Sequence, residues 1–157
     1  MKRIKVIGIG SPFGPDQLGW QAVTHLQKIL QEDAHEHDLS FMQSDRPGMQ
    51  LLDLLKDCDS AILIDAINHK AELGNILQLE REQLVFQARP LSTHAMCVSE
   101  CLTLGAALGM LPEQLVMFGV CIDSADPDDV PHAQVSALCE RICAYVANDL
   151  SANPGPV

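Results

Sequence analysis

Short apolar runs alternate along the chain with longer segments in which apolar residues recur every three or four positions. The runs, such as "RIKVIGIG" and "AILID", are rich in Ile, Val and Leu, which is typical of strands buried on both faces. The longer segments have the spacing of helices with one buried face. The pattern predicts strands at Arg3–Gly10, Asp38–Asp45, Asp59–Ile67, Ile76–Glu80 and Glu113–Ile122, and helices at Asp16–Glu32, from near Gly48, from Thr93 or His94 to Met110, and at Ala133–Leu150.

The order of these elements predicts the class of fold. Strands that alternate with helices favour a mostly parallel sheet, because successive crossovers place helices against its faces. We therefore expect an α/β fold of three layers, with about five strands in the sheet and helices on both faces. The 157 residues fit a single domain over 1–157, with 151–157 as a frayed tail, and residues 81–90 carry no clear pattern.

Composition and charge limit the binding partners and the cellular compartment that we expect. The chain has 21 Asp and Glu against 10 Lys and Arg, a formal net charge of -11, which disfavours nucleic acid and anionic membrane surfaces as partners. No apolar run approaches the roughly 20 residues that span a bilayer. The first strand begins at Arg3 and leaves no room for a signal peptide. We therefore expect a cytoplasmic protein without membrane insertion.

Six cysteines lie inside apolar or helical segments rather than in a loop-rich framework, which is typical of reduced, buried thiols. Two pairs have a four-residue spacing that places both sulfurs on one helix face. A soft-metal site needs more converging thiolates or CxxC spacing, so core thiols are favoured over metal ligands. The six are Cys58, Cys97, Cys101, Cys121, Cys139 and Cys143.

Three ionisable residues follow the points where predicted strands end. Asp16 lies at the turn after the first strand, Asp65 closes "AILID", and His94 opens the helix after "RPLST". Since the carboxyl ends of parallel strands meet at one edge, the three can converge, and two carboxylates with one imidazole suit nickel, zinc, iron or manganese. Spacing alone favours the plainer interpretation, in which they are loop or helix-cap residues. Weaker candidates lie in a helix (His25), a polar loop (His35 and His37), after a strand (His69) or in an acidic loop (His132).

The glycines after the first strand raise a second possibility, a phosphate-binding loop. Gly8, Gly10 and Gly14 approximate a dinucleotide pattern, and Asp45 at the end of the second strand agrees with a ribose contact. However, prolines in the loop remove N–H donors, and Asp16 places a negative charge where a pyrophosphate would bind. Dinucleotide binding is therefore disfavoured. There is also no G-x-S-x-G elbow and no Cys/His nucleophile signature.

Taken in order, "GIGSPFGPDQLGW", "DRPGMQLLDLL", "ILIDAI" and "STHAMCVSECLTLGAALGMLPEQLVMFGVCI" resemble the hydrogenase maturation proteases, roughly from Ile4 to Tyr145. The resemblance implies a twisted sheet and a metal-dependent, aspartic-type endopeptidase. The implied substrate is the nickel-iron hydrogenase large-subunit precursor, whose C-terminal extension is removed after nickel insertion. Asp16, Asp65 and His94 would be its catalytic and metal-contacting residues. The substrate would supply the nickel, and zinc or cadmium could occupy the site in the isolated protein, for which a monomer is expected.

The turn at Asp16 departs from the family pattern. Ser11 stands where Asn is usual, and "PDQLGW" replaces an acidic pair. If "LGW" stays in register, Pro15 replaces the first acid and Asp16 is the metal-binding second one. If the glycines stay in register, Gln17 takes the ligand position. We favour the first alignment, because a neutral amide replaces a carboxylate ligand poorly.

These departures leave alternatives open. A relative with the same fold could act on another precursor, or could bind metal-dependently without cleaving. A small nucleotide-binding α/β domain is the weakest alternative. The resemblance also leaves open whether the metal polarises the scissile carbonyl, or whether the side chains act as a general base.

Overall fold

The computed structural model describes residues 2–11, 17–68, 74–86, 95–122 and 132–152. All five predicted strands are present, and the helices lie between them as the pattern indicated. In chain order the elements are β1 (Arg3–Gly10), α1 (Leu18–Ile29), α2 (Gln31–Glu36), β2 (Asp38–Asp45), α3 (Gln50–Leu54), β3 (Ser60–Asn68), β4 (Ile76–Glu80), α4 (Arg81–Phe86), α5 (Ala95–Ala107), β5 (Gln114–Ile122) and α6 (His132–Ala152).

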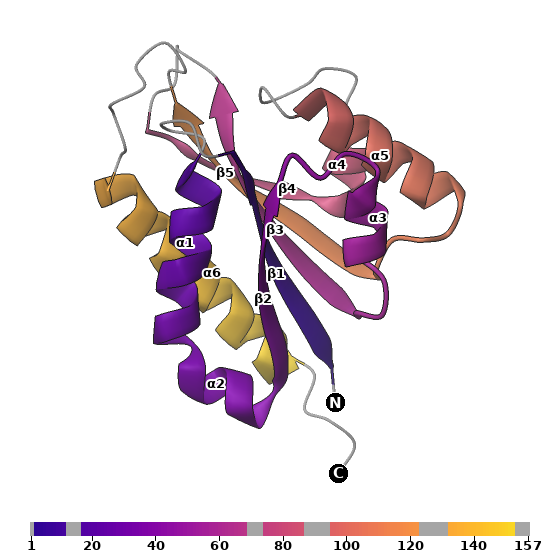
Figure 1. The fold of residues 1–157 in the computed structure, drawn as a ribbon. Coiled ribbons are helices and arrows are strands. Elements are labelled where there is room, and N and C mark those ends of the chain that lie inside the picture. The colour runs from indigo at the N-terminus through magenta and orange to yellow at the C-terminus, as the bar shows by residue number, and fades with distance from the viewer. Residues whose placement is uncertain (1, 12–16, 69–73, 87–94, 123–131, 153–157) are drawn as a thin grey trace.

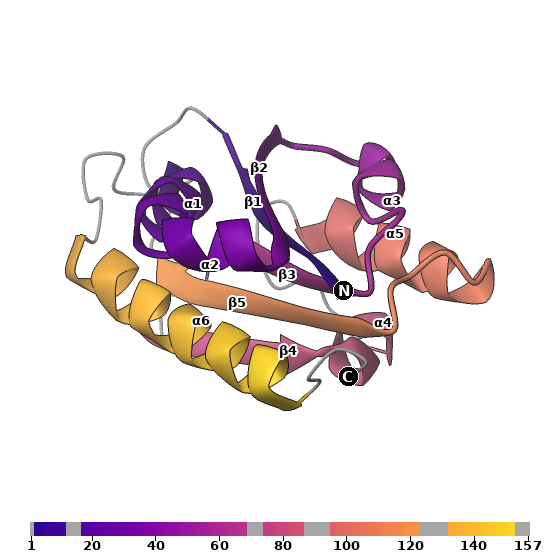
Figure 2. The same cartoon turned by 90° about the horizontal axis from the view of Figure 1, so that it is seen from below.

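The strands form one twisted sheet in the order β2-β1-β3-β5-β4. β1, β2, β3 and β5 run parallel, and β4 pairs antiparallel with β5 at one edge. Helices α1, α2 and α6 cover one face, while α3, α4 and α5 cover the other (Figure 1 and Figure 2). The predicted three-layer α/β fold is confirmed.

The sheet divides the buried apolar residues into two clusters. Alternate side chains of each strand point to opposite faces. Val6, Ile64 and Phe118 therefore pack against α1 and α6, whereas Ile7 and Leu63 pack against α3 and α5. Burial on both faces explains why the central strands are almost continuously apolar.

Two short helices were not predicted. The helix expected to reach Glu32 ends at Ile29, and α2 follows, so His35 lies in a helix and not in a polar loop. Leu30 and Ala34, four residues apart, both pack against the first cluster. In the unassigned segment after Glu80, α4 buries Leu84 in the second cluster, so one apolar contact fixes each short helix.

The sheet reverses its strand order at β1. The chain leaves β1 to form β2 on one side and later β3 on the other, so the carboxyl ends of β1 and β3 flank a topological switch point. In open α/β sheets, ligands bind outside the carboxyl ends of the strands at such a point. In the described part of the chain, no helix combines the length and hydropathy needed to cross a membrane.

Candidate active site

Asp65 lies on β3 at the switch point. The pairing of β1 with β3 ends at Gly8 and Ile64, so Asp65 is the first residue of β3 beyond it. Its side chain lies on the same face of the sheet as Leu63 and Ile67, the face that α3 and α5 cover. Only 1% of Asp65 is exposed. A carboxylate this deeply buried at a sheet edge is a strong candidate for a functional group.

Local contacts hold this carboxylate in place. Asp65 Oδ1 accepts a hydrogen bond from the backbone N–H of Ala66, at 2.8 Å. Directly across the ladder, β5 carries Gly119, and the Ile67 side chain fills the space that a Cβ would need there. Because only 1% of Asp65 is exposed, bulk water screens its charge little, which strengthens its interaction with any cation that enters.

A glycine pair brings the first turn of α1 against the main chain of β1 and β3. A Cβ on Gly8 would collide with the backbone of Gly19 and lie 2.7 Å from Val23 Cγ2. A Cβ on Gly19 would collide with Ile9 O and lie 2.8 Å from Ile64 O. Gly8 therefore serves close helix–strand packing, and the beginning of α1 lies beside the residue that precedes Asp65. The sequence interpretation missed Gly19, although "LGW" opens the helix.

The two other predicted site residues, Asp16 and His94, lie outside the described residues. The described chain resumes at Gln17, directly before α1, and at Ala95, the first residue of α5. Figure 1 shows that α1 and α5 both begin toward the carboxyl ends of the strands, on opposite faces of the sheet. The predicted helix starts at Asp16 and at Thr93 or His94 also fall outside the described residues.

The turn after β2 adds a charged pair to this edge. The backbone N–H of Arg46 donates to Gly10 O at 3.1 Å, which ties the turn to the end of β1. Arg46 has a φ of +43°, a left-handed conformation that is uncommon for residues other than glycine. Its Nε lies 2.8 Å from Asp45 Oδ1, and both side chains are about half exposed. Asp45, the ribose candidate, is thus paired with a cation.

The other weak candidates are scattered over the part of the chain that the structure describes, or lie outside it. His25 is exposed on α1, His132 begins α6, and His69 lies outside the described residues. Among the described residues, no three His, Cys, Asp or Glu side chains are grouped to hold a metal ion.

The cysteines fit the prediction of core thiols. Cys101, Cys121 and Cys139 are buried, Cys58 and Cys143 are half-buried, and all five are free. Burial raises the pKa of Cys139 to about 12, because the thiolate would lose its hydration. A thiol that keeps its proton at neutral pH is a poor metal ligand. The side chain of Cys97 lies outside the described residues.

Fold and site together define a small, doubly wound α/β protein with a buried carboxylate at its switch point. The chain belongs to the hydrogenase maturation protease family, whose family model matches residues 21–142. Asp65 and His94 fall inside the matched range, whereas Asp16 precedes it. The resemblance inferred from the sequence motifs is thus confirmed.

A curated relative is similar over part of its length. The chain is 29% identical over 121 residues to the hydrogenase expression/formation protein HupD of Bradyrhizobium diazoefficiens. The match covers 74% of this chain and 61% of the relative, so the chain spans less than two thirds of that protein.

Solved structures confirm the fold. The hydrogenase maturating endopeptidase HybD from E. coli superposes with a TM-score of 0.72 at 23% identity, over 97% of this chain and 94% of that one. The [NiFe] hydrogenase maturation protease HybD from Thermococcus kodakarensis gives 0.63 at 19% identity, over 94% and 98% of the two chains. Similarity at this level of identity establishes a shared fold.

Proposed function

We propose that this protein is an endopeptidase that removes the C-terminal extension from a nickel-iron hydrogenase large-subunit precursor once nickel is inserted. Membership of the hydrogenase maturation protease family supports the reaction and the class of substrate. The observation that carries the proposal is Asp65, a carboxylate that is 1% exposed and lies at the switch point of the sheet.

In this proposal Asp65 acts together with Asp16 and His94 on the nickel centre of the precursor. Two carboxylates and an imidazole are suitable ligands for a borderline divalent ion. Three protein ligands alone bind an ion with modest affinity, unless the precursor supplies further ligands. Nickel is therefore part of the substrate, and its presence signals that insertion is complete. In the isolated protein, zinc or cadmium would occupy the same three side chains.

Hydrolysis adds one water molecule across the scissile amide. A general base takes a proton from the attacking water, and the departing amine nitrogen gains a proton as the C–N bond breaks. We propose that a carboxylate at the switch point is this base, which makes the enzyme aspartic in type. The bound nickel orients the precursor and polarises groups close to it.

We place the reaction in the cytoplasm, with the enzyme as a monomer. The support for this compartment is the state of the cysteines, because the five that the structure describes are all free thiols. Free, buried thiols are typical of proteins in reducing compartments.

The experiment compares purified precursor with and without nickel. We expect the protein to shorten the nickel-loaded precursor and to leave the apo form intact, measured as intact mass over time. Asp65→Asn and His94→Ala should abolish shortening, whereas Asp59→Asn at the opposite end of the sheet should retain it. Equal cleavage of both forms would contradict the proposal that the enzyme recognises nickel. Nickel-dependent binding without cleavage would identify a binding module instead.

The turn before α1 needs its own test, because two alignments assign different ligands. If Asp16 is the ligand, Asp16→Asn should abolish shortening and Gln17→Ala should leave it within about threefold, since an exchange that touches no reacting group costs little. The reverse result would assign the ligand position to Gln17.

A further inference from the structure

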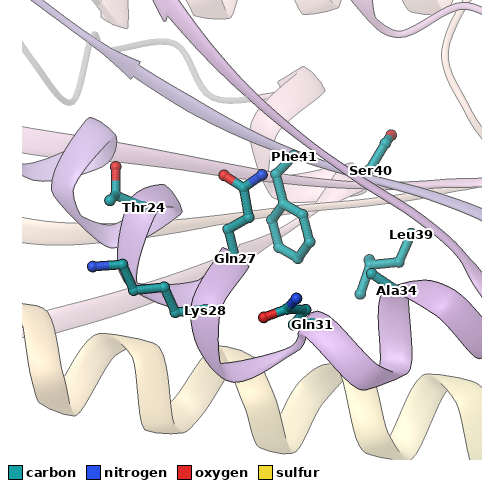
Figure 3. Close-up of a pocket in the computed structure, with 8 residues that line it drawn as sticks. All are labelled: Thr24, Gln27, Lys28, Gln31, Ala34, Leu39, Ser40 and Phe41. Carbon is teal, nitrogen blue, oxygen red and sulfur yellow. The ribbon is translucent and has the colours of Figure 1, made fainter.

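Two hollows lie along the outer side of α1, away from the buried carboxylate. The first, of about 600 Å³, lies between α1, α2 and the edge strand β2, with Phe41 turned toward Gln27 and Gln31 (Figure 3). The second, of about 580 Å³, begins at Gln17 beside the start of α1. Both are lined by Thr24 and Lys28. They therefore adjoin, and we call the surface they form the α1–β2 groove.

The α1–β2 groove lacks the acidic character of the chain. Among the residues that the structure describes, none that lines either hollow is Asp or Glu, although the chain carries a net charge of -11. Glutamines such as Gln27 and Gln31 line it, and an amide side chain can both donate to and accept from a peptide backbone. The amide of Gln43 already donates to Trp20 O and Thr24 Oγ1. An acidic ligand would therefore meet less electrostatic repulsion in the groove than over the rest of the protein surface.

Lys28 supplies a positive charge to the groove. Among the described residues, Lys28 has neither an ion-pair partner nor a hydrogen bond, and its side chain is exposed. Two other lysines are paired with acids: Lys2 with Asp149 at 2.5 Å and Lys56 with Asp53 at 2.8 Å. Lys28 is therefore available to a carboxylate from outside.

The edge of β2 offers main-chain groups beside this charge. β2 is the terminal strand of the sheet and, in the described part of the chain, pairs with β1 alone. Because the N–H of Arg46 points to β1, the alternation of a parallel ladder turns the main chains of Phe41 and Gln43 to the outer side. Such an edge can accept an extended peptide as an additional strand.

The opposite edge of the sheet is less open. β4 has five residues against eight in β2. The Arg141 side chain of α6 also reaches this strand, where its Nη1 donates to Ile76 O at 3.1 Å. A peptide strand is therefore better accommodated at β2.

The groove begins at the edge where the active site is proposed. Gln17 directly precedes α1, and Lys28 lies near its far end. At 1.5 Å per helical residue, about 16 Å separates the two. An extended peptide covers that length with about five residues at 3.3 Å each.

We propose that the α1–β2 groove binds the substrate's C-terminal extension in extended form, as a strand added to β2, with a side-chain carboxylate of the extension at Lys28. This inference rests on the proposed function, because the extension is the segment that leaves after cleavage. The body of the precursor then stays at the carboxyl edge, and the groove selects extensions that carry an acid about five residues farther along.

The first test separates binding from chemistry. Lys28→Glu should raise KM for the nickel-loaded precursor about tenfold and leave kcat within twofold, because the contact is distant from the scissile bond. The KM of Lys28→Gln should lie between those of the wild type and Lys28→Glu. Lys56→Glu, an exposed charge reversal in the turn after α3, is the control and should change neither constant. An unchanged KM for Lys28→Glu would overturn the proposal.

The second test measures occupancy without cleavage. Trp20 lines the groove and is the single tryptophan of the chain, so its emission reports a bound peptide. The probes are amidated eight-residue peptides that copy the start of the extension, with acids kept or changed to amides. The acidic probe should shift Trp20 emission and inhibit processing. The amide probe, and the acidic probe with Lys28→Glu, should do so at least fivefold less effectively.

The outcomes distinguish the groove from the reaction. If the wild-type protein cleaves nickel-loaded precursor but neither test depends on Lys28, the extension does not bind in the α1–β2 groove, and the proposed function stands. If the acidic probe binds through Lys28 but the precursor is never shortened, the groove stands and the proposed function fails. An acidic probe that neither shifts Trp20 emission nor inhibits processing contradicts the groove.

Discussion

The two ends of the sheet are built from different interactions. At the amino ends of the strands, polar contacts join neighbouring elements: Lys2 bonds Asp149 of α6, and the Arg3 N–H donates to Asp59 Oδ2 at 2.8 Å. Lys5 Nζ reaches the Leu54 carbonyl at 3.0 Å. These groups satisfy one another, so this end stabilises the fold and has little left for a ligand.

The carboxyl ends depend on close packing and one buried acid. Gly8 and Gly19 bring helix and sheet together, and Asp65 is sequestered beside them. Strained or costly groups such as these persist where function requires them. The contrast assigns stability to the amino ends and chemistry to the carboxyl ends. Four sets of substitutions can break or sharpen it.

Gly19→Ala should have the largest effect on stability. The new Cβ would meet the carbonyl oxygens of Ile9 and Ile64, which are backbone atoms and cannot rotate away. We expect a loss of about 3 kcal/mol in the free energy of unfolding, as for severe overpacking. Urea denaturation followed by circular dichroism measures it.

Gly105→Ala is the matched control, because it is also a glycine inside a helix. Its Cβ would approach only the side chains of Leu52 and Leu111, which can shift. The gain in helix propensity, up to about 1 kcal/mol, offsets that strain, so the net change should stay within about 1 kcal/mol. Equal losses for both variants would show that the carboxyl end is not packed more tightly than the rest.

Asp65→Asn and Asp59→Asn should have opposite effects. The first should reduce processing of the precursor at least about hundredfold, as expected for loss of a general base or metal contact, with a small change in stability. The second should lower stability by up to about 1 kcal/mol, because the amide oxygen still accepts from the Arg3 N–H but without the charge of the carboxylate, and should retain activity. Processing rates and melting temperatures of the two proteins decide the matter. Full activity in Asp65→Asn would place the chemistry elsewhere.

Lys2→Met tests the amino end more directly. The side chains of Lys2 and Asp149 are 12% and 11% exposed, so their 2.5 Å contact is better shielded than a surface ion pair. Removal of the ammonium group should cost about 1.5 kcal/mol, between the values for exposed and buried pairs. A double-mutant cycle with Asp149→Asn isolates the pair. A coupling energy near zero would mean that Lys2 contributes through its stem and its hydrogen bond to Gln114 Oε1.

Arg46→Gly should have the smallest effect. Glycine adopts a φ of +43° without strain, which favours the folded state by roughly 1 kcal/mol. The loss of the Asp45 ion pair and the greater freedom of glycine in the unfolded chain act against this gain. We expect a net change within about 0.5 kcal/mol, measured by thermal unfolding. A loss above 1 kcal/mol would show that the Arg46 side chain stabilises this edge.

The sequence predicted the strands and the position of Asp65 because both depend on local pattern. A run such as "AILIDAI" is apolar on both faces, so its strand and the acid that interrupts it stand out. Short helices escape such patterns, because a helix of six residues is stabilised by tertiary contacts rather than by its own sequence. Leu84 of α4 and Ala34 beside α2 supply those contacts.

The role of the first glycines could not be predicted for a similar reason. Gly8 fits a phosphate loop and a helix–strand contact equally well, and the outcome depends on how close α1 lies to the sheet. Gly19, eleven residues later, decides between them, since the two glycines face each other only in the fold. The convergence of Asp16 and His94 with Asp65 stays a prediction.

The bond between Lys2 and Asp149 also has a practical consequence for handling the protein. It joins the first strand to the last helix at the end of the sheet remote from Asp65. An affinity tag, a fluorophore or a surface linker attached near either residue would therefore leave the carboxyl edge facing the solution. The same closeness makes the pair a natural junction for a circular permutant, in which new chain ends open in an exposed connection elsewhere.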